Sequence, residues 1–125
     1  MSDAPSILVV DDDPDMCWAM GHILLSHGCE VNIVSQGMDA LDLVQQTPPS
    51  LIFMDAKLPD MDGLDVARLI HQRNPGIRIV MVSGYYYADD PAIREAVEQN
   101  IINGFIAKPF ARGDILQAVE DHSPS

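Results

Sequence analysis

The chain has 125 residues, the usual size of one compact domain. About 47% of the residues are hydrophobic, which is enough for a core and too much for a disordered tail. Nineteen acidic residues oppose seven basic ones, and the formal charge of −12 disfavours binding to nucleic acid phosphates or anionic lipid. We therefore expect a single domain over 1–125, with a core of about 6–121, that binds cations rather than nucleic acid or membrane.

The cysteines and the N-terminal segment indicate an intracellular protein. Cys17 and Cys29 lack the spacing of a zinc site, and a chain of this length needs no disulfide for stability. The first residues contain no basic region, and no stretch approaches the roughly 18 apolar residues that a membrane span needs. We expect reduced cysteines and a cytoplasmic location.

Five short apolar runs rich in Val and Ile alternate with longer helical patterns, which is typical of a parallel α/β sheet. Each run is apolar at successive positions, as expected for strands that are covered on both faces. We expect strands over these ranges: 7–10, 31–34, 51–54, 79–82 and 104–107.

Cap and stop residues predict helices after each of these strands. Asp13-Pro14 combines a capping side chain with proline at the first helical position, and Gly28 marks the end of that helix. Ser35 is the expected cap of the second helix, which Pro48-Pro49 ends.

Two further starts follow from the same rules. Asp62 caps the third helix, and Asp90-Pro91 begins the fourth. A fifth helix covers about 113–121, where the start is least clearly marked. The predicted architecture is (βα)5, of the α/β class.

Charged and hydroxyl residues follow four of the five expected strands, at the sheet edge where parallel α/β domains bind their ligands. These residues are Asp11, Asp12 and Asp13 after the first strand, Asp55 after the third, Ser83 after the fourth and Lys108 after the fifth. Any one of them alone would be explained as a helix cap, a turn hydroxyl or a surface turn. Together they predict a functional site.

The chemistry of these residues suits phosphoryl transfer onto a carboxylate. Two carboxylates about 4 Å apart repel by roughly 4 kcal/mol at an effective dielectric of about 20, so Asp11, Asp12 and Asp55 need a counter-charge. Mg2+ is the natural one, because it prefers carboxylate oxygens and retains room for water and phosphate. Asp13 is expected only to cap its helix. A nucleophile, a metal site, a hydroxyl and a cation are the parts that this transfer needs.

The sequence resembles the receiver domain of bacterial two-component response regulators over about 6–121. The resemblance is carried by four segments: ILVVDDDPDM at 7–16, LIFMDAKLPDMDG at 51–63, IVMVSG at 79–84 and GFIAKPF at 104–110. It implies a flavodoxin-like three-layer sandwich with a five-stranded parallel sheet in the order 2-1-3-4-5. It also implies a signalling phosphoacceptor, which catalyses only its own phosphorylation and dephosphorylation, rather than an enzyme.

The resemblance assigns a phosphoacceptor and a metal site. Asp55 would take a phosphoryl group from a histidine kinase or phosphotransfer protein. Asp12 and Asp55 would ligate Mg2+ together with the backbone carbonyl of Lys57, and Asp11 would act largely through water.

The resemblance also assigns a switch. Ser83 and Lys108 would each bond a phosphoryl oxygen, and Phe105 would turn inward as Ser83 moves. Ser83 stands where threonine is frequent and Phe105 where tyrosine is frequent, so the hydroxyl and the ring are kept. The fourth helix, fifth strand and fifth helix would form the output face. Whether this face contacts an output protein, an output domain or a second copy of the chain is left open.

Two aromatic features have alternative interpretations. Tyr85, Tyr86 and Tyr87 either pack the loop or have a binding role, and we hypothesise that Tyr85 and Lys57 overhang the site and limit the access of water to the phosphoaspartate. Trp18 is either a core residue or part of a docking face.

Two rival functions remain. Asp11, Asp13, Ser83 and Lys108 imitate the order of residues in haloacid-dehalogenase-type phosphatases, but the acidic pair that follows the lysine in that family is missing. A pseudo-receiver, which keeps the fold without the chemistry, is disfavoured because every residue that the chemistry needs is present.

Overall fold

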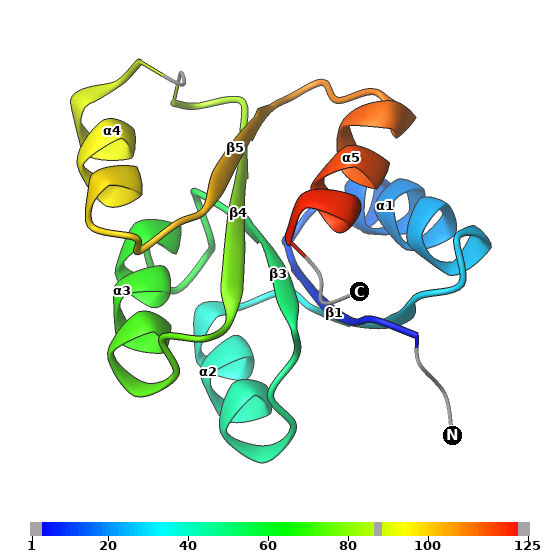
Figure 1. The fold of residues 1–125 in the computed structure, drawn as a ribbon, viewed down its shortest axis with the longest axis horizontal. Coiled ribbons are helices and arrows are strands. Elements are labelled where there is room, and N and C mark those ends of the chain that lie inside the picture. The colour runs from blue at the N-terminus through cyan, green and yellow to red at the C-terminus, as the bar shows by residue number, and fades with distance from the viewer. Residues whose placement is uncertain (1–3, 87–88, 123–125) are drawn as a thin grey trace.

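The computed structural model describes residues 4–86 and 89–122, in which five strands alternate with five helices (Figure 1). The strands are β1 (Ser6–Val10), β2 (Glu30–Val34), β3 (Leu51–Asp55), β4 (Arg78–Ser83) and β5 (Gly104–Ala107). The helices are α1 (Pro14–Ser26), α2 (Gly37–Gln46), α3 (Gly63–Arg73), α4 (Pro91–Glu98) and α5 (Arg112–His122). The predicted alternation is confirmed.

The strands form one parallel sheet in the order β2-β1-β3-β4-β5, as the family resemblance implied. β1 lies beside β3, with Val10 opposite Met54, and β3 lies beside β4, with Asp55 opposite Val82. The residues that follow these three strands therefore come together at one edge of the sheet.

Helices cover both faces of the sheet and complete the predicted three-layer sandwich. α1 and α5 lie against one face, and α2, α3 and α4 lie against the other (Figure 1). Successive strand residues point to opposite faces, so Ile7 and Val9 pack with α1 and α5, whereas Leu8 and Val10 pack with the other three helices. Within the described residues, no helix is long and apolar enough to cross a bilayer.

The expectation that every strand is covered on both faces is wrong for β2. This strand lies at an edge of the sheet, and Glu30, Asn32 and Ile33 are exposed. β1 and β3 lie inside the sheet and are buried along nearly their whole length. An apolar run thus identifies a strand, but its place in the sheet depends on neighbours that are distant in the sequence.

Three predicted helix starts are confirmed by cap hydrogen bonds. The carboxylates of Asp13, Asp62 and Asp90 accept hydrogen bonds from backbone amides in the first turns of α1, α3 and α4. The predicted end of α1 is also confirmed, because Gly28 follows it with φ of +86°, a conformation that glycine adopts easily.

The prediction that Ser35 caps α2 is wrong. Gln36 occupies the cap position and makes no side-chain cap hydrogen bond. The backbone amides of Gly37 and Met38, which have no partner within the helix, donate instead to the carboxylate of Asp60, at 2.7 and 3.0 Å. Asp60 lies in the loop between β3 and α3, so this helix start is capped from a distant part of the chain.

Candidate functional site

Three aspartates gather at the carboxyl ends of β1 and β3. Asp11, Asp12 and Asp55 each offer a carboxylate oxygen, and these oxygens all lie within 4.8 Å of one another. Asp11 is buried, Asp55 is partly buried and Asp12 is exposed. The adjacency of β1 and β3 in the sheet brings together residues that are more than forty positions apart in the sequence.

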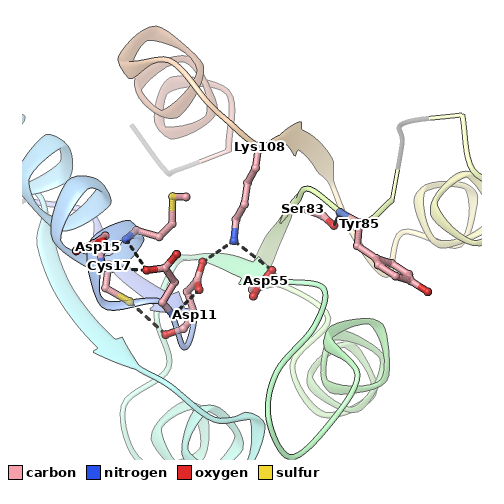
Figure 2. A network of polar contacts seen from close by, with 9 residues as sticks. Asp11, Asp15, Cys17, Asp55, Ser83, Tyr85 and Lys108 are labelled. Carbon is pink, nitrogen blue, oxygen red and sulfur yellow. Dashed lines mark hydrogen bonds and ion pairs between the residues drawn. The ribbon is translucent and has the colours of Figure 1, made fainter.

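Lys108 supplies a positive charge between two of these carboxylates. Its Nζ atom lies 2.9 Å from Oδ2 of Asp11 and 3.3 Å from Oδ1 of Asp55 (Figure 2). The residue follows β5, and its backbone amide donates to the carbonyl of Ser83 at the end of β4. Burial alone would lower the pKa of Lys108, but the hydrogen bond and charge of Asp11, with those of Asp55, outweigh it and raise the pKa. The ammonium is therefore held in its charged form.

A single ammonium does not compensate the charge around Asp55. Burial raises the pKa of Asp55 above its ordinary value, and the charge of Asp11 raises it further, although Lys108 and the backbone amide of Lys57 oppose the shift. The net result is a carboxylate whose ionised form is less favourable here than in water. Three clustered carboxylates with this excess of negative charge are a donor set that fits a hard divalent cation such as Mg2+.

Asp11 is fixed by contacts at both of its carboxylate oxygens. Oδ1 accepts a hydrogen bond from the amide of Asp13 at 2.9 Å, while Oδ2 faces Lys108. The thiol of Cys17 donates to the backbone carbonyl of Asp11 at 3.2 Å (Figure 2). Burial and the charge of Asp11 raise the pKa of Cys17, so this residue stays a thiol and supports Asp11 from α1. The sequence offered no signal for this contact.

Ser83 lies at the end of β4, on the side of Asp55 away from Asp11 (Figure 2). Its side chain is buried, and Oγ accepts hydrogen bonds from the amides of Tyr85 and Tyr86, at 2.9 and 3.1 Å. Because a hydroxyl oxygen has two lone pairs, these amides leave the hydroxyl hydrogen as the group free to donate.

The loop after Asp55 approaches the end of β3 closely. Lys57 pairs with Asp62 in an isolated antiparallel bridge, and the amide of Gly63 donates to the carbonyl of Ala56 at 2.8 Å. A Cβ atom on Gly63 would overlap the backbone oxygen of Asp55. Glycine at this position therefore allows α3 to begin against the strand end that carries Asp55.

The side chain of Lys57 meets that of Tyr85. The Nζ atom of Lys57 lies 4.2 Å from the centroid of the Tyr85 ring, within the range of a cation–π contact. Tyr85 is exposed and packs edge to face with Tyr86, whose ring is partly buried against the core. Loop packing thus accounts for Tyr86, and Tyr87 lies outside the described residues. The proposed effect of the Lys57 and Tyr85 pair on water access stays a prediction.

Phe105 and Trp18 differ in burial: Phe105 is partly buried and Trp18 is exposed. Phe105 lies on β5 opposite Met81 and packs, partly buried, against the core on the side of α2, α3 and α4. Trp18 is 72% exposed and stacks on His22, so the core interpretation of Trp18 is wrong, and the docking interpretation stays a prediction.

The contacts of Asp13 argue against the phosphatase alternative, which counts this residue among its site residues. Its carboxylate caps α1 by accepting from the amides of Asp15 and Met16, at 3.0 and 3.5 Å. The carboxylate that faces Asp11 and Lys108 is Asp55, which the phosphatase alternative leaves without a role.

Comparison with known proteins gives one consistent result. A model of the response regulator receiver domain matches residues 7–120. Sporulation initiation phosphotransferase F of Bacillus subtilis (strain 168) is 30% identical over 118 residues, which cover 94% of this chain and 93% of that protein. The C4-dicarboxylate transport transcriptional regulatory protein DctD of Rhizobium meliloti (strain 1021) is 32% identical, but the match covers only 25% of its length.

Solved structures agree with this result. A CheY-like response regulator receiver domain protein from Methanospirillum hungatei JF-1 superposes with a TM-score of 0.87 at 28% identity, covering 95% of this chain and 93% of the other. The sheet order, the strand-end carboxylates and the family match over most of the chain lead to the same conclusion. The chain belongs to the response regulator receiver domain family and is a receiver domain of the two-component kind.

Proposed function

We propose that Asp55 is the phosphoacceptor of this receiver domain. The observation that carries the proposal is the position of Lys108, whose ammonium bridges Asp11 and Asp55 beside Asp12. Lys108 already lies at hydrogen-bond distance from the carboxylate oxygen of Asp55, so it can contact an oxygen of a phosphoryl group joined there.

The transfer step conserves the phosphoryl group. A carboxylate oxygen of Asp55 attacks the phosphorus atom of a phosphohistidine, a new O–P bond forms, and the P–N bond breaks. The bonding electrons leave with the imidazole nitrogen of the donor. Lys108 stabilises the negative charge on the phosphoryl oxygens, and the buried position of Asp11 keeps that lysine in place.

Asp11, Asp12 and Asp55, with the backbone carbonyl of Lys57, are the groups that would hold Mg2+ in this site. The bound ion would neutralise the carboxylates and the phosphoryl oxygens. The fit rests on the donor set, which consists of hard oxygen ligands with one exposed member, Asp12, open to solvent.

Ser83 and Phe105 form the proposed switch. The hydroxyl hydrogen of Ser83 is free to donate to a phosphoryl oxygen on Asp55. Movement of Ser83 toward that oxygen would alter the amide contacts that it makes with Tyr85 and Tyr86 and so reshape the loop before α4. Phe105, which is only partly buried now, would then turn further inward.

The proposed partners follow from this chemistry. The donor is a histidine kinase or phosphotransfer protein in the cytoplasm, and the exposed Trp18 on α1 belongs to the face that would meet it. The output face is α4, β5 and α5, and its target is a protein or an output domain rather than nucleic acid, which the charge of −12 opposes.

Intact-mass analysis tests the proposal. The chain is incubated with a small acyl phosphate and Mg2+, and Asp55→Asn is treated in parallel. We expect one added phosphoryl group in the wild type and none in the variant. Asp13→Asn is the matched control, because it removes a neighbouring acid that caps α1 and lies outside the proposed acceptor set.

Three results would overturn the assignment. One is phosphorylation of the Asp55→Asn variant at wild-type yield. Another is loss of phosphorylation in the Asp13→Asn control while that control stays folded. The third is a wild-type chain that accepts a phosphoryl group from neither the acyl phosphate nor a phosphorylated histidine kinase.

A further inference from the structure

The loop between β3 and α3 turns back on itself before α3 begins. Lys57 pairs with Asp62 in an antiparallel bridge, and the amide of Leu58 donates to the carbonyl of Met61 at 3.2 Å. Residues 57–62 therefore form a short hairpin, with its base next to the sheet edge and Asp60 at its tip.

The base of this hairpin lies against the proposed phosphoacceptor. The backbone amide of Lys57 donates a hydrogen bond to the carboxylate of Asp55. The amide of Gly63 donates to the carbonyl of Ala56 at 2.8 Å, which fixes the point where the chain leaves the hairpin. The backbone of Lys57 is thus held beside the carboxylate cluster, and its carbonyl is the group proposed above as a Mg2+ ligand.

The tip of the hairpin is held by a different part of the molecule. The carboxylate of Asp60 accepts hydrogen bonds from the amides of Gly37 and Met38, at 2.7 and 3.0 Å, and each of its oxygens takes one amide. The bonds from Met38 and Gly37 lower the pKa of Asp60, so the acceptor is ionised at neutral pH. Hydrogen bonds to an ionised acceptor are stronger than those to a neutral one. The tip is therefore fixed to the start of α2.

Packing brings the hairpin and α2 together, but the hydrogen bonds give the contact its direction. α2 and α3 lie next to each other (Figure 1). A Cβ atom on Gly37 would lie 3.0 Å from the sulfur of Met61 and 2.8 Å from a methyl carbon of Val66. Within the described part of the chain, every hydrogen bond between the hairpin and α2 is made by Asp60.

The ligands proposed for Mg2+ differ in how firmly they are placed. Mg2+ needs near-octahedral coordination at short distances, so a displaced ligand weakens binding. Asp11, Asp12 and Asp55 lie at the ends of two neighbouring strands inside the sheet. The carbonyl of Lys57 belongs to the hairpin, and a backbone group cannot compensate for a displaced loop by a change of rotamer. The hairpin is thus the part of the metal site that depends on contacts outside the sheet.

We propose that Asp60 is a positioning residue for Mg2+, because it fixes the tip of the hairpin to α2 and so holds the carbonyl of Lys57 where the ion can bind it. The inference rests on the proposed metal site and extends that site to a residue outside the donor set. Coupling between two sites is reciprocal, so bound Mg2+ should in turn strengthen the contact between Asp60 and α2.

Isothermal titration calorimetry of the chain with Mg2+, without a phosphodonor, tests the proposal. Asp60→Ala should raise the dissociation constant by about 2- to 30-fold, the range of helix-cap contacts expressed as an equilibrium constant. Asp60→Asn removes the same charge but keeps a side-chain oxygen, and asparagine caps a helix about as well as aspartate. It should therefore restore most of the affinity that Asp60→Ala loses.

Val44→Ala separates positioning from a general loss of stability. Val44 is a buried core residue of α2, seven positions after Gly37, so its truncation lowers stability and leaves the contact of Asp60 in place. The titrations are made at a temperature where all variants are folded. Val44→Ala should then change the Mg2+ dissociation constant by less than about twofold, as expected for a distant site.

Hydrogen exchange provides a second readout, which does not depend on affinity. The amides of Gly37 and Met38 should exchange more slowly in Mg2+ than in chelator, because the bound ion strengthens their contact with Asp60. In Asp60→Ala at saturating Mg2+, this difference should disappear from both amides. General stabilisation by the metal would instead persist in that variant.

Equal Mg2+ affinity of the wild type and Asp60→Ala would overturn the inference and leave the metal site intact. Equal losses of affinity in Asp60→Ala and Asp60→Asn would also overturn it, as would exchange at Gly37 and Met38 that Mg2+ does not change. A wild-type chain that binds no Mg2+ would overturn the proposed metal site and the inference with it. Intact mass after treatment with the acyl phosphate tests Asp55 as the phosphoacceptor separately, since that result does not depend on the role of Asp60.

Discussion

The Oδ1 atom of Asp60 lies 2.7 Å from the backbone nitrogen of Gly37 and accepts its hydrogen bond. This contact ties the start of α2 to the loop that follows the proposed phosphoacceptor. The packing is close, because a Cβ atom on Gly37 would lie 2.8 Å from a methyl carbon of Val66 and 3.0 Å from the sulfur of Met61. The loop and the first turn of α2 therefore form one structural unit.

Asp60→Ala should lower stability because it leaves the first amides of α2 without their cap. The hydrogen bonds from Met38 and Gly37 lower the pKa of Asp60 below its ordinary value of 3.8. A carboxylate with a lowered folded-state pKa contributes stability above its unfolded pKa and loses it as the pH falls through the folded one. Urea unfolding of the wild type and the variant should thus differ at neutral pH, and the difference should shrink as the pH falls below 3.8 and through the lowered folded-state pKa.

Asp39→Ala is the control for this prediction. Asp39 is an exposed acid in the first turn of the same helix, so it shares the charge and location of Asp60 relative to the helix start. It should lower the urea midpoint less than Asp60→Ala does. Equal effects of the two variants would show that charge near the helix start matters and that the cap itself does not.

The strands and most helix ends could be predicted from the sequence, because patterns within a few residues determine them. Apolar runs identified the strands, and Asp-Pro pairs together with Gly28 identified helix ends, because cap and turn chemistry acts within a few residues. Ser35 was the wrong cap for α2, since the true cap, Asp60, comes from a loop that is distant in the sequence. The exposure of β2 could not be predicted from its apolar residues either, because it depends on the position of this strand at the edge of the sheet.

The candidate site was predictable to a similar extent. Carboxylates, a hydroxyl and a lysine at strand ends were enough to name the charged and hydroxyl residues, because the ends of adjacent parallel strands meet. The backbone carbonyl of Lys57 and the ring of Phe105 were named only through the family resemblance. Their contacts were not predictable. The bridge that Lys108 makes between Asp11 and Asp55 and the contact of Lys57 with Tyr85 depend on side-chain directions, which no sequence pattern fixes.

Mg2+ should raise the melting temperature of the chain, because an ion that binds only the folded state stabilises it, by about 2.7 kcal/mol at 100 times the dissociation constant. Asp12→Asn should remove most of this response. Asp13→Asn is the control. Asparagine caps a helix about as well as aspartate, so this change removes a charge beside the site with little effect on the cap of α1, and it should keep the full response to Mg2+. Differential scanning calorimetry with and without chelator measures this response.

Asp55→Asn should stabilise the metal-free chain. Burial and the charge of Asp11 raise the pKa of Asp55, so above that pKa its ionised form is less favourable in the folded chain than in the unfolded one. An uncharged side chain of the same shape avoids this cost, so we expect the variant to be more stable than the wild type in chelator at neutral pH.

Lys108→Met provides the opposite change at the same site. It removes the ammonium between Asp11 and Asp55 and leaves two close carboxylates to repel each other, so it should lower stability in chelator. Chemical unfolding in chelator compares the stability of each variant with that of the wild type. A loss of stability in Asp55→Asn would mean that the ion pair with Lys108 outweighs the cost of burying the charge.

Gly63→Ala should be strongly destabilising. The added methyl group would overlap the backbone oxygen of Asp55 and separate the start of α3 from the end of β3, at a cost of more than about 2 kcal/mol. Gly113→Ala is the control, since a Cβ atom there meets no neighbouring atom and alanine favours the helix by about 0.5–1 kcal/mol. If unfolding shows the two variants to be equally stable, the close approach at Gly63 has no structural importance.

Lys57 and Tyr85 should slow hydrolysis of the phosphoaspartate by covering the site. The pair joins the loop after β3 to the loop after β4, with the ammonium 4.2 Å from the ring centroid. A cation–π contact of about 0.5–1 kcal/mol corresponds to a change of roughly 2- to 5-fold in half-life. Lys57→Ala, Tyr85→Ala and the double variant should therefore shorten the half-life to the same extent, because either change breaks the one contact.

The conservative variants Tyr85→Phe and Lys57→Arg keep the ring and the cation, so they should preserve the wild-type half-life. The decay of phosphorylated chain is followed by intact mass after the phosphodonor is removed. Additive effects of the two alanine substitutions would show that each side chain acts independently. An unchanged half-life in the double variant would show that water reaches the phosphoryl group by a path that these residues do not cover.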